Sequence, residues 1–251
     1  MELRGKSVLI TGGRRVGSAL ALMLADRGAL VAMTYHASRA AIEGTVAAVR
    51  ERGGSGLAIA ADLAQGAQAE EAVAATVAAF GRIDVLVNMA SIFRRTPLSS
   101  LTPADFDAMI AANLAAPYHT AVAAARRMLA QPAEGGLKGK IVNVGDWAVD
   151  RPYRDYLPYL VAKGGLKTMT LALARELAPD VTVNMVQPAL IDPPPDFSPA
   201  DLAAVIAATP LRRIGSSDDL NRLILYLLEG TDFATGSCYR VDGGRFLGGD
   251  D

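Results

Sequence analysis

The feature that most constrains the fold of this 251-residue chain is a regular alternation of short apolar runs with longer segments of helical spacing. The short runs are rich in Val and Ile and predict strands at 7–11, 30–34, 56–60, 85–88, 140–144, 181–186 and 237–241. The longer segments predict helices at 16–27, 38–52, 67–80, 103–113, 116–129, 156–177 and 217–228. Because strands that are apolar throughout are buried on both faces, we expect an α/β fold with one doubly wound parallel sheet and helices on either side.

Composition narrows the class of protein further. No Ser-, Gly- or Pro-rich linker divides the chain, so we expect a single domain over residues 1–251. The formal net charge is -1 and no basic stripe appears, which argues against nucleic acid and favours a small-molecule substrate. The first apolar run is too short for a signal peptide or a membrane span, so we expect a cytoplasmic protein with no membrane contact. With Cys238 alone and only two histidines, we expect no metal site.

A glycine-rich turn joins the first predicted strand to the first predicted helix. Residues 11–18 read Thr-Gly-Gly-Arg-Arg-Val-Gly-Ser. Glycines permit a tight turn and close approach of the backbone to a pyrophosphate, and the amides at a helix N-terminus favour an anion. This position in a doubly wound (Rossmann) sheet predicts a dinucleotide site that includes Gly12, Arg14, Arg15, Val16 and Gly17.

The end of the second predicted strand indicates which dinucleotide is bound. An acidic residue there would bind the ribose 2′-hydroxyl of NAD, and this chain has none. The segment instead carries His36, Ser38 and Arg39, and Arg14 and Arg15 lie in the neighbouring turn. These donors favour a 2′-phosphate, so we expect NADPH as the cofactor, with Ser38 also at the helix N-cap.

Tyr159 and Lys163 stand four residues apart on a predicted helix, and therefore share a face. A cation near a phenol lowers the pKa of the phenol, so this pair predicts a proton donor for hydride transfer. Asp146 lies thirteen residues upstream of Tyr159, at a position where a serine would be the usual companion. A carboxyl group can deliver a proton that a serine hydroxyl gives up reluctantly near neutral pH.

Together these motifs resemble the short-chain dehydrogenase/reductase family over essentially the whole chain. The matching pieces are the turn at 11–17, Asp62-Leu63, the stretch 88–91, Asn113, the Tyr159 and Lys163 pair, the stretch 184–188 and 242–244. The resemblance implies an oxidoreductase, either homotetrameric or dimeric, and we expect the homotetramer. In that family the tyrosine donates the proton, the lysine binds the nicotinamide ribose and lowers the tyrosine pKa, and Asn113 would hold a water beside the lysine.

The same resemblance supplies the remaining site residues. It implies further cofactor contacts from Asp62, Leu63, Asn88, Ala90, Ser91, Tyr159, Lys163, Pro188 and Leu190. Within the family, the chain looks most like pteridine reductases and dihydromonapterin reductases. Asp146 in place of serine, the pair Arg14-Arg15, and the stretches 88–93 and 113–118 carry that likeness. Three departures from the family pattern are a glycine turn one residue shorter than usual, Met89 in place of a frequent asparagine, and Ala189 after Pro188 in place of a frequent glycine.

This likeness predicts NADPH-dependent reduction of a dihydropterin, dihydromonapterin or dihydrofolate. Phe93 would then stack on the pterin, Asp146 and Tyr159 would deliver protons, and Arg15 and Ser91 would complete the substrate site; the loop 191–197 would cover it. One alternative is a carbonyl reductase that acts on a ketone or an acyl-carrier substrate, against which a carboxylate beside a developing alkoxide argues. A second alternative is a noncatalytic NADP-binding sensor.

Overall fold

The computed structural model describes residues 1–133, 136–193 and 197–248. Its centre is a seven-stranded sheet in the order β3-β2-β1-β4-β5-β6-β7, and every pair of neighbouring strands is parallel. The strands are β1 Ser7–Thr11, β2 Leu30–Tyr35, β3 Ser55–Ala60, β4 Val85–Asn88, β5 Gly139–Val144, β6 Val181–Pro188 and β7 Cys238–Val241. The expected doubly wound sheet is therefore confirmed, and each predicted strand is present within a residue or two of its expected ends.

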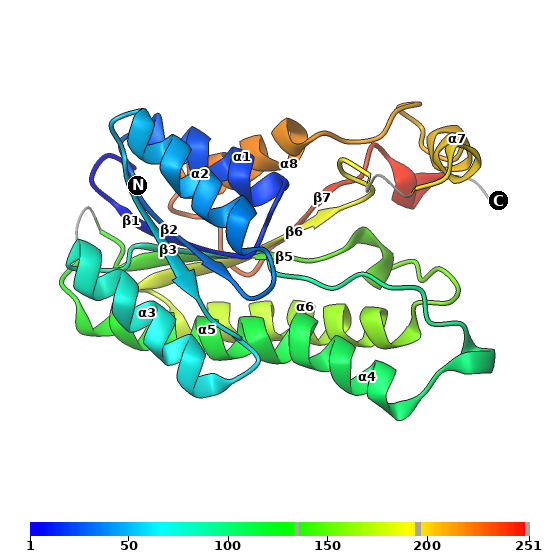
Figure 1. The fold of residues 1–251 in the computed structure, drawn as a ribbon, viewed down its shortest axis with the longest axis horizontal. Coiled ribbons are helices and arrows are strands. Elements are labelled where there is room, and N and C mark those ends of the chain that lie inside the picture. The colour runs from blue at the N-terminus through cyan, green and yellow to red at the C-terminus, as the bar shows by residue number, and fades with distance from the viewer. Residues whose placement is uncertain (134–135, 194–196, 249–251) are drawn as a thin grey trace.

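Helices cover both faces of the sheet (Figure 1). One layer contains α1 Val16–Ala25, α2 Arg39–Glu51 and α8 Ser217–Leu225, and the opposite layer contains α3 Gly66–Phe80, α4 Pro103–Ile110, α5 Ala116–Ala130 and α6 Leu157–Leu177. A further helix, α7 Pro199–Ala207, lies beyond the end of the sheet near the described C-terminal residues (Figure 1). Right-handed crossovers that run to opposite sides of β1 place their helices on opposite faces, which accounts for α1 and α2 in one layer and for α5 and α6 in the other. Helix α8, which leads to β7, lies in the layer of α1 and α2.

Each face of the sheet has its own apolar core, which explains why the strands are apolar at successive positions. Val8 and Ile10 of β1 point toward α1 and α8, where they join Leu24. Leu9, between them, points the other way and packs in the cluster that contains Ala124 of α5 and other residues of α5 and α6. Since successive side chains of a strand face opposite sides, both sets had to be apolar for the sheet to be buried.

Two helices end earlier than their periodicity predicts. The helix expected at 103–113 stops at Ile110 and continues as a π-helical turn, Ala111–Ala115, before α5 begins. The helix expected at 217–228 stops at Leu225 and is followed by the π-helical turn Tyr226–Gly230. Such turns insert a residue into the helical register, and they are frequent at functional sites. The first of them contains Asn113, one of the predicted site residues.

Helix α7 was not predicted, although its start carries a clear signal. Ser198 accepts a hydrogen bond from the amide of Asp201, and Pro199 occupies the first turn. Thr102, Pro103 and Asp105 form the same kind of start at α4. None of the residues of α7 is buried. The helix therefore needs no apolar face toward a core, and it lacks the apolar periodicity that identified the other helices.

The carboxyl ends of β1 and β4 meet at the point where the strand order reverses. Thr11 pairs with Asn88 at this edge, and the hydroxyl of Thr11 accepts hydrogen bonds from the amides of Met89 (3.1 Å) and Ala90 (3.3 Å). The glycine turn after β1 and the loop after β4 are thereby fixed against each other. Ligands of doubly wound sheets bind at this switch point, so the fold places the candidate site here.

Candidate functional site

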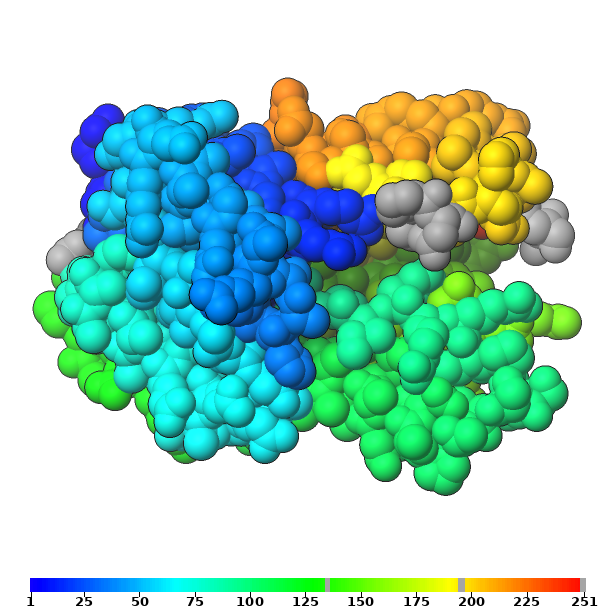
Figure 2. All heavy atoms as spheres, in the orientation of Figure 1, coloured from blue at the N-terminus to red at the C-terminus, as the bar shows by residue number. Residues whose placement is uncertain are grey.

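A large cleft lies beyond the carboxyl ends of the strands and has a volume of about 1190 Å³. Figure 2 shows the surface hollowed between the green side of the molecule that contains α4 and the yellow and orange residues that lead through α7. Most of the predicted site residues line it: Gly12, Arg14, Arg15, Val16, His36, Ser38, Asp62, Leu63, Ala90, Ser91, Phe93, Asp146, Tyr159, Lys163, Pro188 and Leu190. Gly17, Arg39, Asn88 and Asn113 are not part of this lining.

The glycine turn forms one end of the cleft. Gly12 and Gly13 have positive φ angles of 60° and 80°, a conformation that favours glycine. A Cβ atom on Gly13 would lie 2.8 Å from the Cα of Gly17 and 2.8 Å from the sulfur of Met89. Met89 therefore fills the space that the short turn leaves, and Gly17 is needed for packing against the turn. Helix α1 begins after Arg15 with no side-chain cap, as a helix N-terminus that receives an anion does.

The residues after β2 form the neighbouring wall of the cleft. His36 and Ser38 line it, and Ser38 is the N-cap residue of α2, as predicted, although its side chain makes no capping hydrogen bond. Arg39 points elsewhere. Its side chain is 74% exposed and its guanidinium pairs with Glu43 at 2.9 Å, one helical turn away. Among the three arginines expected at a 2′-phosphate, only Arg14 and Arg15 line the cleft.

Asp146, Tyr159 and Lys163 meet at the middle of the cleft. Asp146 follows β5, and its backbone oxygen accepts a hydrogen bond from Gln187 of β6 at 3.2 Å. The Tyr159 hydroxyl donates to Asp146 Oδ2 at 2.8 Å, and the amide of Ala148 donates to Oδ1 at 2.8 Å. Lys163 Nζ donates to the backbone oxygen of Val144 at 2.8 Å and lies 5.8 Å from the centre of the Tyr159 ring.

Burial dominates the electrostatics of these three groups. It raises the pKa of Asp146 above its ordinary value, and its hydrogen bonds and the charge of Lys163 only partly oppose this shift. Burial lowers the pKa of Lys163 to about 8. The pKa of Tyr159 is raised well above its ordinary value by burial and by the neighbouring Asp146. In this arrangement the ammonium of Lys163 bonds to Val144 while the phenol faces a carboxyl group, and the lowering of the Tyr159 pKa by Lys163 stays a prediction.

Asn113 and Asn88 support the cleft from behind its surface. Asn113 is fully buried in the π-helical turn and accepts a hydrogen bond from the Ser91 hydroxyl at 2.6 Å. Asn113 Oδ1 also accepts a hydrogen bond from the backbone amide of Ile92 at 3.2 Å, and Asn113 Nδ2 donates one to the backbone oxygen of Ile92 at 3.0 Å. Asn88 donates to Asn143 of the next strand at 2.9 Å. Both side chains thus hold the loop after β4 in place, and a water beside Lys163 held by Asn113 stays a prediction.

An aromatic wall encloses the cleft beside Asp146. The ring of Phe93 stacks on Tyr156, with centroids 4.5 Å apart and planes 11° apart, and it meets Tyr159 edge-on at 5.0 Å. Tyr153 stands edge-on to Tyr156 at 5.0 Å, and Trp147 lies 6.2 Å from Tyr153. One face of Phe93 is therefore covered by Tyr156, and the side chain is 53% exposed. Sequence reasoning missed Tyr153 and Tyr156, although Tyr156 lies three residues before Tyr159 and so shares its helical face.

The loop after β6 closes the same end of the cleft as Arg15. Arg15 donates a hydrogen bond to the backbone oxygen of Asp192, whose carboxylate accepts from the amide of Ser217 at 3.0 Å. Ile191 and Phe197 line the cleft, as the predicted covering loop 191–197 requires, while residues 194–196 lie outside the described part of the chain. Arg245, another residue that the sequence reasoning missed, also lines the cleft.

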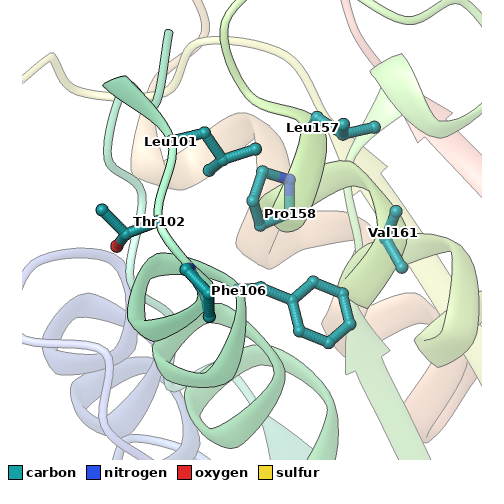
Figure 3. Close-up of a pocket in the computed structure, with 7 residues that line it drawn as sticks. Leu101, Thr102, Phe106, Leu157, Pro158 and Val161 are labelled. Carbon is teal, nitrogen blue, oxygen red and sulfur yellow. The ribbon is translucent and has the colours of Figure 1, made fainter. Parts of the chain in front are cut away.

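A second hollow of about 350 Å³ lies between α4 and the start of α6. Figure 3 shows Phe106 of α4 facing Pro158 and Val161 of α6 across it, with Leu101 and Leu157 at its rim. Its lining is apolar apart from Thr102 and contains no ionisable side chain. This hollow therefore carries no chemistry of its own.

The described ranges contain neither a cluster of metal ligands nor a helix suited to a membrane. No group of three or more His, Cys, Asp or Glu side chains there is arranged to hold a metal ion. No helix in these ranges has the length and apolar character needed to cross a membrane.

The raised pKa of Asp146 has a consequence for stability. When an acid has a higher pKa in the folded than in the unfolded state, stability falls as the pH rises from the unfolded to the folded pKa, because the charge must be buried. We therefore expect Asp146→Asn to raise the free energy of unfolding at neutral pH. The difference should disappear as the pH falls below the unfolded pKa of aspartate, about 3.9. Urea unfolding of both proteins over a pH series measures it.

Asp219 provides a control of opposite sign. Its pKa is lowered by hydrogen bonds from Arg213 and Ser216, so its contribution is present at neutral pH and is lost as the pH falls through its folded pKa. Asp219→Asn should therefore lower stability at neutral pH and converge with the parent in acid. An Asp146→Asn protein less stable than the parent at neutral pH would contradict the prediction. It would show that hydrogen bonds and the charge of Lys163 offset the cost of burying the carboxylate.

Comparison with known proteins places this geometry in a family. The family model described as enoyl-(acyl carrier protein) reductase matches residues 13–245. A 3-oxoacyl-(acyl-carrier-protein) reductase of Synechocystis is 33% identical over 249 residues, which cover 98% of each chain. Among solved structures, a short-chain dehydrogenase from Burkholderia cenocepacia in complex with NADP is 35% identical, with a TM-score of 0.89 over 98% of this chain and 99% of that one.

A second solved structure gives the same result. The short-chain dehydrogenase/reductase of Serratia marcescens is 32% identical, with a TM-score of 0.89 over 98% of this chain and 100% of that chain. Sequence match and fold agree over almost the full length of each protein. The chain belongs to the short-chain dehydrogenase/reductase family.

Proposed function

We propose that this protein uses NADPH to reduce a carbonyl group, the kind of group that the names of its 3-oxoacyl reductase relatives specify. The observation that carries the proposal is the hydrogen-bonded pair of Tyr159 and Asp146 on the cleft floor, next to Lys163. The relatives from Synechocystis and Staphylococcus epidermidis are both named as 3-oxoacyl-(acyl-carrier-protein) reductases and match nearly the whole chain. They favour a carbonyl substrate over a pterin.

The residues at the glycine turn fit a phosphorylated dinucleotide. The backbone at Gly12 and Gly13 has no room for side chains, and the uncapped start of α1 faces the cleft. Arg14, His36 and Ser38 line the wall after β2, where no acidic side chain would repel a 2′-phosphate. We propose that these residues hold NADPH, which when bound supplies the hydride.

The raised pKa of Asp146 weakens the objection that a carboxylate would repel a developing alkoxide, because it favours the neutral carboxyl more than in an exposed aspartate. A protonated Asp146 carries no charge, and the 2.8 Å distance to Tyr159 suits a hydrogen bond in either direction. The carboxyl can donate to the phenol oxygen while the phenol proton passes to the substrate oxygen. Asp146 thereby replaces the proton that Tyr159 gives up, and activity should fall as the pH rises through the Asp146 pKa.

Reduction of a pterin C=N bond is the second candidate, and Asp146 together with Phe93 favours it. A protonated carboxyl can protonate a ring nitrogen as hydride arrives, and the free face of Phe93 offers a flat surface to a heteroaromatic ring. The stacking partner Tyr156 leaves only that one face of Phe93 for a ligand. This candidate keeps the same cofactor and the same proton donors.

A substrate panel separates the candidates. NADPH consumption is measured with 3-oxoacyl thioesters, simple ketones, dihydropterins and dihydrofolate, for the parent and for Asp146→Ser. We expect turnover of the carbonyl compounds, and the serine variant should keep it within about tenfold because a hydroxyl still donates to Tyr159. Tyr159→Phe should lose about 10²-fold or more.

Other results would reassign the function. Turnover of dihydropterins alone, abolished by Asp146→Ser, would establish the second candidate. NADPH binding without turnover of any compound, in the parent and in Tyr159→Phe alike, would support a noncatalytic sensor.

The two arginines near the 2′-phosphate site make a matched pair. Arg14 lines the cleft, whereas Arg39 lies outside its lining and pairs with Glu43. We expect Arg14→Ala to raise the KM for NADPH about tenfold and to change the KM for NADH little, since a charged hydrogen bond contributes about 1.5–3 kcal/mol. Arg39→Ala should change the NADPH value less than about twofold. A larger effect at Arg39 would restore the assignment of that residue to the 2′-phosphate.

We also propose that the protein assembles as a homotetramer. Large apolar side chains are exposed along α4, α5 and α6: Phe106, Tyr118, Leu129, Leu157, Val161 and Leu171. A second copy of the chain would cover such a surface. Light scattering should give four times the chain mass of 26.2 kDa, and Leu171→Arg should reduce it. A monomeric parent would contradict the proposal.

A further inference from the structure

Tyr153 is a cleft residue that the scheme above does not use. It lies in the loop between Asp150 and α6, outside the Tyr159 and Lys163 pair. Its hydroxyl donates to Asp146 Oδ2 at 3.4 Å, the same oxygen that accepts from the Tyr159 hydroxyl at 2.8 Å. Two phenols from different elements thus converge on one carboxyl oxygen.

Packing fixes the direction in which the Tyr153 hydroxyl points. The ring is edge-on to Tyr156 at 5.0 Å and to Phe93 at 6.3 Å, and Trp147 lies 6.2 Å away at 50°. A ring enclosed on several sides by other rings keeps its orientation. The distance of 3.4 Å to Asp146 is that of a weak hydrogen bond, and long hydrogen bonds of catalytic groups often tighten in the complex with substrate.

Asp146 becomes charged during the proposed reaction. The carbonyl carbon would receive the hydride that bound NADPH supplies, with the oxidised cofactor as product, and the proton of Tyr159 passes to the carbonyl oxygen. The proton of the Asp146 carboxyl then moves to the Tyr159 phenolate oxygen, which leaves Asp146 ionised until a proton from solvent replaces it. At that stage Oδ1 accepts from Ala148 and Oδ2 accepts from the restored Tyr159 hydroxyl, and the negative charge on the carboxylate favours a second donor to Oδ2.

We propose that Tyr153 is a positioning residue for the proton relay, which holds Oδ2 of Asp146 against Tyr159 and supplies a second hydrogen bond to Oδ2 once the carboxyl has given up its proton. This inference rests on the proposed function, because it assigns Tyr153 to the relay through Asp146. Tyr153 acts on the carboxyl group rather than on the substrate.

The other groups that face Asp146 cannot take this role. From α6, Tyr159 is the relay partner itself, and Lys163 Nζ is bonded to Val144 and acts on Asp146 only through its charge. From β6, Gln187 bonds to the backbone oxygen of Asp146 and not to its carboxyl. Ser91 faces Tyr159 and bonds to Asn113. Tyr153 is therefore the described side chain outside the pair that donates to the carboxyl group.

Tyr153→Phe removes this donor and leaves the ring. Because the Tyr153 hydroxyl favours the ionised form of Asp146, its loss should raise the pKa of Asp146, and the fall in kcat at alkaline pH should begin at a higher pH. We expect kcat at neutral pH to drop about tenfold and KM to stay within about twofold. A purely structural role would lower kcat without moving the pH profile.

Tyr156→Phe is the matched control. Tyr156 belongs to the same aromatic wall, and no hydrogen bond joins its hydroxyl to a described residue. Its loss should leave the pH at which kcat falls where it is in the parent. An equal shift in both variants, an unmoved profile in Tyr153→Phe, or a change in KM alone would overturn the proposal.

A titration that needs no substrate separates this inference from the proposed function. The carboxyl carbon of Asp146, followed by ¹³C NMR in the full-length protein, should titrate at a higher pH in Tyr153→Phe than in the parent. Asp146→Asn identifies the resonance by its disappearance. If the parent reduces no carbonyl yet Tyr153→Phe moves this titration, the proposed substrate is wrong and the role of Tyr153 stands. If the titration does not move, the role of Tyr153 is wrong whatever the substrate.

Discussion

Burial of the parallel sheet on both faces is the constraint on which the rest of the structure depends. Leu9 packs on one side of β1 while Val8 and Ile10 pack on the other, so neither face of this central strand is free to meet a ligand. Polar side chains within the strands, such as Asn143 and Asn184, are buried and hydrogen-bonded, and the groups that can meet a ligand lie at the strand ends. The parallel arrangement then brings the carboxyl ends of β1, β4, β5 and β6 to one edge, and the cleft forms there.

The same burial sets the chemistry of the cleft. Asp146 lies buried beside an aromatic wall, and this burial raises the pKa of its carboxyl group. This rise in pKa changes the chemical role that Asp146 can take. As a carboxylate, Asp146 would oppose the charge that develops on a carbonyl oxygen, and as a neutral acid it can return a proton to Tyr159. The aromatic wall thus serves the proton transfer as well as the shape of the cleft.

Much of the fold could be predicted from local patterns. The strand ends, and with them the positions of Gly12, Asn88 and Asp146, follow from apolar runs that a two-sided core requires. Helix α7 was not predicted because its residues are not buried and so show no apolar periodicity. Ser198 and Pro199 nevertheless repeat the helix start seen at Thr102 and Pro103. The π-helical turn at Asn113 was not predicted because the periodicity of apolar residues does not reveal a residue inserted into the helix.

The sequence by itself determined the element order, the glycine turn, the Tyr159 and Lys163 pair and the place of Asp146, because each depends on spacing along one element or on its end. Tertiary structure decided which donors meet. Arg39 was expected in the cofactor site. Its guanidinium instead pairs with Glu43, which lies one helical turn away. Tyr153 converges with Tyr159 on one oxygen of Asp146 through the packing of separate segments. The pKa of Asp146 also belongs to this level, since burial is a property of the assembled cleft and of no single segment.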